Sequence, residues 1–255
     1  MVFLIKNNFI RLLFGTICLF CFSSCDKEEE TFLLNIEFKH LIDNEEIVYG
    51  NDNIVYDNNT SNIYSVRRLL YVLSDVVLYF DDGSSLLLDG FFFVNTDDSE
   101  TLFYTIENLP GICSGISFRL GFSSEKNIEN AHVNSPNNFH LSMLWPNLNG
   151  INLAYQGGYH YMKIEGKYVD FDAFKGQSFF YNTHTGPIYA EDFSILYPEF
   201  DFKPSENITI NMNVNNWYND PIYLMVDFGP AIMDNIDAQN ILYQNGLDVF
   251  SVQVN

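Results

Sequence analysis

Residues 207–218, "NITINMNVNNWY", decide the fold class of this 255-residue chain. Apolar side chains stand at every second position from Ile208 to Val214, and asparagine or threonine occupies each position between them. Because successive side chains of a β-strand point to opposite faces of the sheet, this alternation predicts a strand with one buried face and one exposed face.

Similar stretches, rich in β-branched and aromatic residues, recur along the chain between turn signals. They are residues 32–38, 66–80, 84–95, 114–122 and 158–166. Asp82-Gly83 is a strong hairpin signal. Helical spacing is convincing only near the end, from Ile232 to Leu242, where Asn245-Gly246 is the stop signal. The pattern predicts an all-β fold, an antiparallel β-sandwich with a short C-terminal helix.

The first 31 residues have the features of an export and anchoring segment. Two basic residues precede an apolar run at residues 12–22, which is too short to span a membrane. The following Ser23-Ser24-Cys25 resembles a bacterial lipobox. We therefore predict a lipoprotein signal peptide at residues 1–24 and a tether at residues 25–31 that begins with an acylated Cys25. Residues 32–255, which contain no Pro-, Gly- or Ser-rich linker, are predicted to form one β-sandwich domain.

The anchor and the net charge restrict the partners. Residues 26–30, "DKEEE", are similar to the acidic signal that exports lipoproteins of Bacteroidota. We expect an outer-membrane lipoprotein, with cell-surface display and retention on the inner leaflet as the alternatives. Ten basic against 33 acidic residues after Cys25 give a net charge of −23, which repels nucleic acid. The expected partners are the membrane, through the lipid anchor, and an outer-membrane transporter or metal-handling protein. The sequence leaves the oligomeric state open.

The sequence contains no motif of a familiar catalytic class. A Gly-x-Ser-x-Gly nucleophile elbow, a phosphate-binding loop, an HExxH zinc helix and an EF-hand loop are all absent from the sequence. We therefore predict a protein that binds rather than catalyses. Cys113 is the one cysteine after Cys25, so an internal disulfide is ruled out for the mature chain, and a small buried hydrophobic role is predicted for it.

Nitrogen and sulfur donors remain as metal-ligand candidates. Met143 offers a thioether, which suits Cu(I), and imidazole suits copper or zinc. A β-sandwich brings distant strands together, so spacing neither supports nor excludes a shared site. The five histidines are His40, His132, His140, His160 and His184.

Several blocks, in one order, resemble the MbnP-like family. They are "VRRLLYVLSDVVLYFDDG" at 66–83, "SGISFRLGF" at 114–122, "MLW…GGYHYMKIEG" at 143–166, "YNTHTG" at 181–186, and "MNVNNWY" followed by "QNGLDVF". The resemblance covers nearly all of the chain after the tether. It implies a secreted or lipid-anchored β-sandwich protein that binds copper, with a site made of histidines and a tryptophan oxidised to kynurenine.

The resemblance also implies particular site residues. His184, in "THTG", matches a strand that ends in a His-x-Gly pattern, and it is the first copper-ligand candidate. His40, at the end of the first strand, is the second, and Met143 would lie alongside. Trp145 matches the tryptophan position and is the candidate for oxidation. Trp217 is assigned to packing within the "NNW" strand.

The sequence departs from the family pattern at three places. Asn147 stands where many relatives carry a second tryptophan, and residues 146–156 are an insertion before the Gly-Tyr strand. His160 occupies a position that is often lysine in relatives, which predicts that it faces solvent.

Two alternatives to copper binding follow from the residues. A cell-surface interaction or glycan-binding module could use exposed aromatic side chains, since the chain has 16 tyrosines. Calcium could bind the oxygen donors of residues 51–59, "NDNIVYDNN", although they fit no known calcium-loop spacing.

Overall fold

The computed structural model describes residues 31–50, 56–57, 62–148, 150–170, 177–189, 191–219 and 232–255. Thr31–Asn255 forms one compact unit. The predicted signal peptide, Cys25 and most of the candidate calcium stretch lie outside the described residues. No helix in the described part of the chain has the length and apolar character needed to cross a membrane.

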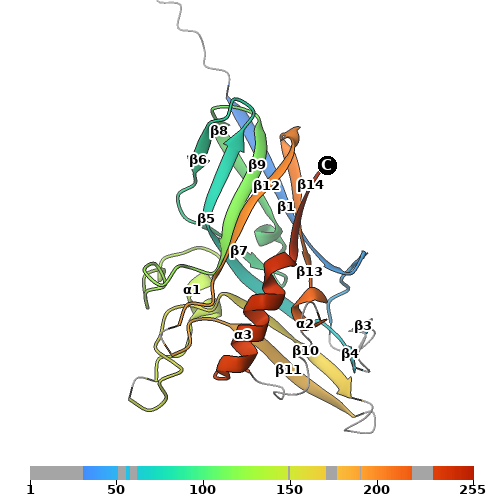
Figure 1. Cartoon of the computed structure of the whole chain (residues 1–255), viewed down its shortest axis with the longest axis vertical. Helices are drawn as coiled ribbons and strands as arrows, with labels where there is room; N and C mark the ends of the chain where they lie inside the picture. The colour runs from blue at the N-terminus through green and yellow to red at the C-terminus, as the bar shows by residue number, and fades with distance from the viewer. Residues whose placement is uncertain are drawn as a thin grey trace, which may run out of the picture. The chain divides into compact units, whose positions relative to one another are not determined.

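The first of two sheets has the strand order β14-β13-β1-β2, with β8 also paired to β1 (Figure 1). Its strands are β1 (Phe32–Ile42), β2 (Glu45–Glu46), β8 (Phe103–Leu109), β13 (Asn207–Asn213) and β14 (Phe250–Val254). β1 and β13 pair in parallel, whereas the other strand pairs of this sheet are antiparallel.

The second sheet has the order β12-β9-β5-β10-β4-β3, with β11 on β10 and both β6 and β7 on β5. Its strands are β3 (Tyr56–Asp57), β4 (Asn62–Tyr64), β5 (Arg68–Phe80), β6 (Ser85–Leu87), β7 (Phe91–Asn95), β9 (Cys113–Leu120), β10 (Met162–Asp170), β11 (Ser178–Thr185) and β12 (Ile195–Ser205). Within the described residues, all strand pairs of this sheet are antiparallel. The predicted all-β sandwich is confirmed.

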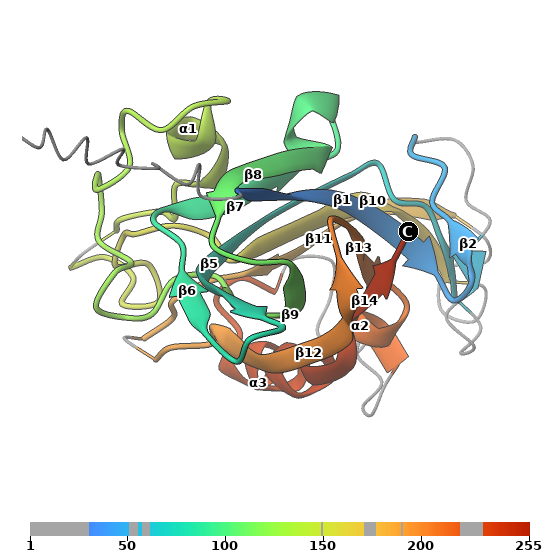
Figure 2. The ribbon, with the colours of Figure 1, turned by 90° about the horizontal axis from the view of Figure 1, so that it is seen from above.

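The main core lies between the two sheets. Seen from above, β1 lies across the molecule from β9 and β12 (Figure 2). The ring of Phe38 on β1 contacts that of Tyr71 on β5, with 6.3 Å between centroids. Phe118 on β9 meets Phe250 on β14 at 5.3 Å. Cys113 is buried in this core as predicted. Such edge-to-face contacts across the sheets are typical of aromatic cores.

The alternating stretch at 207–218 folds as predicted over its first half. Ile208, Ile210 and Met212 are fully buried on β13. The strand stops because the Asn213 side chain accepts a hydrogen bond from the Asn215 backbone N–H, a local turn that competes with the sheet ladder. The assignment of Trp217 to a strand is therefore wrong. It lies in the short helix α2 (Asn216–Asn219), although its core packing is confirmed.

Other local predictions need similar adjustment. Residues 84–95 form two strands rather than one, because Gly90 adopts a φ of +90° between β6 and β7. The predicted hairpin at Asp82-Gly83 joins β5 to β6. The predicted C-terminal helix is α3 (Ile236–Asn245), which begins after Ile232 because the Asn235 side chain accepts hydrogen bonds from the Asp237 and Ala238 N–H groups and caps its start. The backbone N–H of Gly246 caps its last carbonyls. The remaining helical turns are η1 (Ser99–Leu102), α1 (Phe139–Met143) and η2 (Gly246–Asp248).

The outer face of the second sheet carries a second, smaller apolar cluster. The connection from β9 to β10 folds back over this face and brings α1 beside the sheet (Figure 1). Leu70 and Val72 of β5 alternate with the core-facing residues of that strand, so they point outward. They pack against Phe139, Met143 and Tyr159 of the connection. The connection therefore encloses part of the outer face.

Candidate metal centre

His184 lies on this outer face, near the end of β11. It is the cross-strand neighbour of Lys163, whose strand neighbours Met162 and Ile164 point into the main core. Cross-strand neighbours share a face of the sheet, so Lys163 and His184 both point outward. His184 is nevertheless only 7% exposed. The sequence prediction placed this ring correctly at a strand end but gave no reason for its burial.

The Glu165 carboxylate determines which His184 nitrogen carries the proton. Nε2 of His184 lies 3.0 Å from Oε1 of Glu165, in hydrogen-bonding geometry. An ionised carboxylate only accepts hydrogen bonds, so Nε2–H must be the donor. In a neutral imidazole the lone pair is then on Nδ1. This Nδ1 is buried and has no hydrogen-bond partner.

His160 is held in the complementary way by a backbone carbonyl. The Met143 carbonyl oxygen accepts hydrogen bonds from the His160 backbone N–H at 2.7 Å and from its Nδ1 at 3.1 Å. Since a carbonyl only accepts, the proton is on Nδ1 and the lone pair is on Nε2. This Nε2 is also buried without a partner. Each ring therefore keeps one basic nitrogen free.

The expectation that His160 faces solvent is wrong, because it is only 5% exposed. Gly157 and Gly158 adopt φ values of +85° and +92°, which residues with a side chain rarely reach. This turn lets the chain run back along its own preceding segment, where the backbone N–H of Trp145 donates a hydrogen bond to the Gly158 carbonyl. The turn places His160 alongside residues 143–145, where its backbone N–H donates to the Met143 carbonyl. The Gly-Gly pair is the sequence signal that could have revealed this.

The two imidazoles and one indole pack together. The His160 and His184 ring centroids are 5.1 Å apart, and those of Trp145 and His160 are 4.7 Å apart. Trp145 is fully buried. A Cβ added at Gly186 would lie 2.4 Å from its ring, so the indole requires a glycine there. The structure thus brings together Trp145 and His184, the two residues that the sequence predicted for the site, with His160, which the sequence did not predict for it.

Unsatisfied buried polar atoms gather around this group. Among the described residues nine buried side-chain nitrogen or oxygen atoms lack a hydrogen-bond partner. Five of them belong to the two imidazoles, the indole and their neighbours. Trp145, His160 and His184 are in ring contact, Thr185 follows His184 in the chain, and Gln239 donates a hydrogen bond to the His184 carbonyl. The five atoms are Trp145 Nε1, His160 Nε2, His184 Nδ1, Thr185 Oγ1 and Gln239 Oε1. Buried polar groups are normally paired, so this concentration makes the group the candidate ligand site.

Burial keeps both imidazoles in the basic, metal-binding form. Burial lowers the pKa of His184, and burial followed by the neighbouring His184 lowers the pKa of His160 well below its usual range. Both rings are therefore neutral near pH 7. For Glu165 burial alone would raise the pKa, but hydrogen bonds from His184 and Arg68 outweigh it and hold that pKa far below its usual range. Its carboxylate is ionised.

His40 does not join this group, and Met143 contributes its backbone carbonyl to it. His40 lies in the core between the sheets, where its Nε2 is 3.2 Å from the Tyr71 hydroxyl and its ring contacts Tyr49 and Tyr71. Tyr71 belongs to the inner face of the second sheet and His184 to the outer face, so His40 and His184 are separated by that sheet. The Met143 side chain packs in the outer apolar cluster, and its contact with His160 comes from the backbone.

The remaining two histidines lie elsewhere in the connection. The ring of His132 stacks on that of Phe122 at 4.8 Å, and His140 Nδ1 lies 2.9 Å from the Tyr159 hydroxyl. In the part of the chain that the structure describes, no group of three or more His, Cys, Asp or Glu side chains could hold a metal ion. The candidate centre therefore rests on two imidazoles and the indole beside them.

Comparison with known proteins identifies relatives of the whole fold. The MbnP family model matches residues 31–234. Among solved structures, the chain is similar to MbnP from Methylosinus trichosporium, with a TM-score of 0.55 and 12% sequence identity. The similarity covers 88% of this chain and 98% of the other. No curated protein matches the chain. At this identity the solved structure supports the fold.

Proposed function

The chain belongs to the MbnP family, and from that premise we propose that it is a lipid-anchored, extracytoplasmic protein that binds copper and captures or hands on the ion without catalytic turnover. The observation that carries the proposal is the contact between two buried, neutral imidazoles, His160 and His184, each with one unpartnered basic nitrogen. Copper is the cargo, and these two nitrogens are its proposed donors.

The donor set favours copper over hard cations. Calcium and magnesium select oxygen ligands, and the two oxygens of Glu165, the carboxylate nearest the pair, already accept hydrogen bonds from Arg68 and His184. Imidazole nitrogen suits copper well, and copper stands at the top of the affinity order for divalent ions at such sites. Burial of both rings keeps competing water and protons away from the free nitrogens.

Trp145 is the proposed oxidation site. The resemblance to the family implies a tryptophan that dioxygen oxidises beside the copper to N-formylkynurenine, which water hydrolyses to kynurenine and formate. Trp145 is in ring contact with His160. Its indole N–H is buried without a partner, so nothing in its surroundings holds the unmodified ring by a hydrogen bond. Intact-mass measurement on protein from its native host, together with metal analysis, would report indole oxidation and bound copper in one preparation.

The proposed location is the outer membrane, through acylation of Cys25, with a transporter or metal-handling protein as partner. The lipobox and the acidic residues after it support this location. Protease treatment of intact cells would distinguish display on the cell surface from the inner leaflet, where the protein would be protected.

Copper titration of the soluble chain lacking residues 1–25 tests the proposed site. We expect uptake of about one copper per chain, and a strong loss of affinity in His160→Ala and in His184→Ala. His140→Ala is the matched control, because this histidine lies in the same connection but contacts Tyr159 instead of the pair. Unchanged stoichiometry and affinity in both site variants would refute the assignment.

The glycan-binding alternative finds little support in the arrangement of tyrosines. Eight of the described tyrosines are buried. Of the other described tyrosines, Tyr189 and Tyr243 are the two with large exposed fractions. Recognition of sugars by aromatic stacking needs several exposed rings on one face. Isothermal titration with a glycan panel, run beside copper, would detect such binding if it occurs.

A further inference from the structure

We propose that Glu165, clamped by Arg68, is a positioning residue that fixes the tautomer of His184 and so selects Nδ1 as the atom offered to copper. The proposal deepens the proposed function and rests on it for the identity of the ligand. The tautomer itself is a property of the metal-free protein, and it can be measured without copper.

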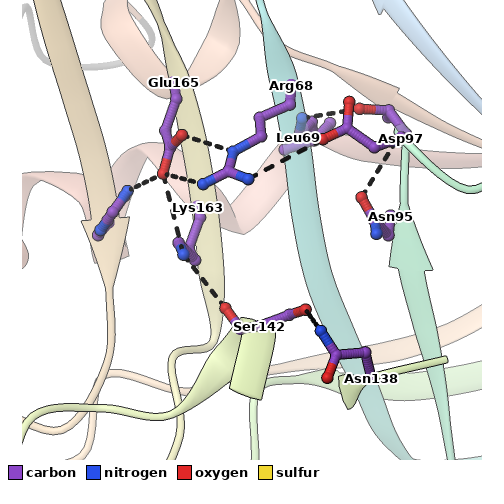
Figure 3. Close-up of polar contacts among 10 residues, drawn as sticks. Arg68, Leu69, Asn95, Asp97, Asn138, Ser142, Lys163 and Glu165 are labelled. Atoms are coloured by element: carbon purple, nitrogen blue, oxygen red, sulfur yellow. Dashed lines mark hydrogen bonds and ion pairs between the residues drawn. The ribbon is translucent and has the colours of Figure 1, made fainter. Parts of the chain in front are cut away.

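The clamp is built by strand register. Glu165 on β10 is the cross-strand neighbour of Arg68 on β5, so their side chains share the outer face of the sheet. Arg68 Nε donates to Oε2 of Glu165 at 2.5 Å, and Nη2 donates to Oε1 at 3.1 Å (Figure 3). Two parallel hydrogen bonds from one guanidinium fix both the position and the plane of a carboxylate. Glu165 therefore cannot rotate away from His184 without breaking this fork.

Further contacts hold the clamp to the segment that carries the other half of the site. Lys163 Nζ is 3.9 Å from Oε1 of Glu165 and donates to the Ser142 carbonyl at 3.1 Å (Figure 3). Arg68 also pairs with Asp97 at 3.9 Å. Ser142 precedes Met143, whose carbonyl orients His160. One network of charges and hydrogen bonds thus extends from the Glu165 carboxylate to the segment whose Met143 carbonyl orients the second imidazole.

Glu165 acts through His184 and is not itself a ligand in this arrangement. Both of its oxygens already accept charged or polar hydrogen bonds, and one of them receives the His184 Nε2–H. A histidine that binds a metal commonly donates its other N–H to a carboxylate, which fixes the ring and increases its basicity. With Nε2 protonated, Nδ1 is the one nitrogen of His184 that has a lone pair.

Glu165→Gln is the decisive substitution because it keeps the shape and removes the obligate acceptor. An amide can accept from Nε2–H or donate to a bare Nε2, so His184 would become a mixture of both tautomers. Asp75→Asn is the matched control. Asp75 is also a partly buried carboxylate paired with an arginine, Arg119, and asparagine tolerates its left-handed backbone at φ +51°.

Two measurements on the purified protein decide the proposal. Nitrogen-15 NMR of the imidazoles should show His184 protonated on Nε2 alone in the wild type and in Asp75→Asn, and a tautomer mixture in Glu165→Gln. Copper titration should show an affinity about 10- to 100-fold lower in Glu165→Gln and unchanged in Asp75→Asn. Arg68→Lys, which keeps the charge but loses the fork, should fall between them.

The outcomes separate this proposal from the proposed function. If the wild type binds copper and Glu165→Gln binds it equally well, the positioning role is refuted while copper binding stands. An unchanged His184 tautomer in a folded Glu165→Gln protein would refute it too. If the wild type binds no copper but the tautomer changes as expected, the proposed function fails and the assignment of Glu165 as the residue that sets the tautomer survives.

Discussion

Replacing Gly186 by alanine should disturb the candidate centre through a single methyl group. An added Cβ would lie 2.4, 2.6 and 3.0 Å from three ring carbons of Trp145. Carbon atoms in contact are normally about 3.5–4.0 Å apart, so the indole would have to move by about 1 Å. The indole is fully buried and contacts the rings of His160 and Tyr155, so its neighbours resist this movement.

The expected cost combines two opposing terms. Overpacking a well-packed site destabilises a protein by about 1–3 kcal/mol. Replacing glycine by alanine at a backbone conformation that alanine can adopt stabilises the folded protein by about 0.4–1 kcal/mol, because it lowers the conformational entropy of the unfolded chain. We therefore expect Gly186→Ala to lower the free energy of unfolding by about 1–2 kcal/mol and the melting temperature by about 2–4 °C for each kcal/mol. Copper affinity should fall about tenfold or more, because displaced Trp145 moves His160.

Urea unfolding followed by fluorescence, and copper titration of the folded protein, measure the two effects. Gly111→Ala is the control, because a Cβ there would meet neighbouring atoms at ordinary distances of 3.5 to 3.7 Å. It should change neither quantity by a comparable amount. If Gly186→Ala unfolds at the wild-type urea concentration and binds copper with wild-type affinity, the close approach of Gly186 to the indole does not constrain the site.

Three further predictions concern other parts of the molecule. Burial lowers the pKa of His40 to about 3, whereas in the unfolded chain this imidazole takes up a proton near pH 6.5. The contribution of neutral His40 to the free energy of unfolding is therefore fully present above pH 6.5. Between pH 6.5 and the folded-state pKa it falls by about 1.4 kcal/mol per pH unit. Urea midpoints at pH 7 and pH 5 should therefore differ more in the wild type than in His40→Gln, and equal differences would contradict this reasoning. Gln239→Ala removes the donor to the His184 and Ile232 carbonyls and should cost about 1–3 kcal/mol, measured by urea unfolding. An unchanged midpoint would show that these bonds do not stabilise α3. Cys25→Ala should release the protein from the membrane fraction, and continued membrane association in fractionated cells would argue against the lipid anchor.

The candidate centre shows where reasoning from sequence reaches its limit. The family blocks led to His184 and Trp145, and these two residues do lie in one cluster with His160. His40 was chosen because the family resemblance implies a histidine near the end of the first strand, but a position along a strand does not say which face of which sheet a side chain occupies. The packing of His40 against Tyr71 places it on the other side of the second sheet.

The fold class could be read from the chain because it depends on local periodicity. Alternating residues from Ile208 to Met212 and the capped helix that ends before Gly246 were both predicted and are both present. The end of β13 was not predicted, because a turn made by the Asn213 side chain interrupts an alternation that continues in the sequence. Likewise, the parallel pairing of β1 with β13 joins strands far apart in the chain, which no local pattern encodes.

The sequence by itself therefore determined which segments form strands, the acidic net charge and the family of this protein. Each of these is a property of neighbouring residues or of overall composition. The tertiary structure decided which imidazole meets His184 and which nitrogen of each ring stays free. Those outcomes depend on the Gly157-Gly158 turn, on strand register, and on acceptors supplied by Met143 and Glu165. Hydrogen bonds between groups brought together only by folding select one tautomer of each ring, and amino-acid order alone leaves both open.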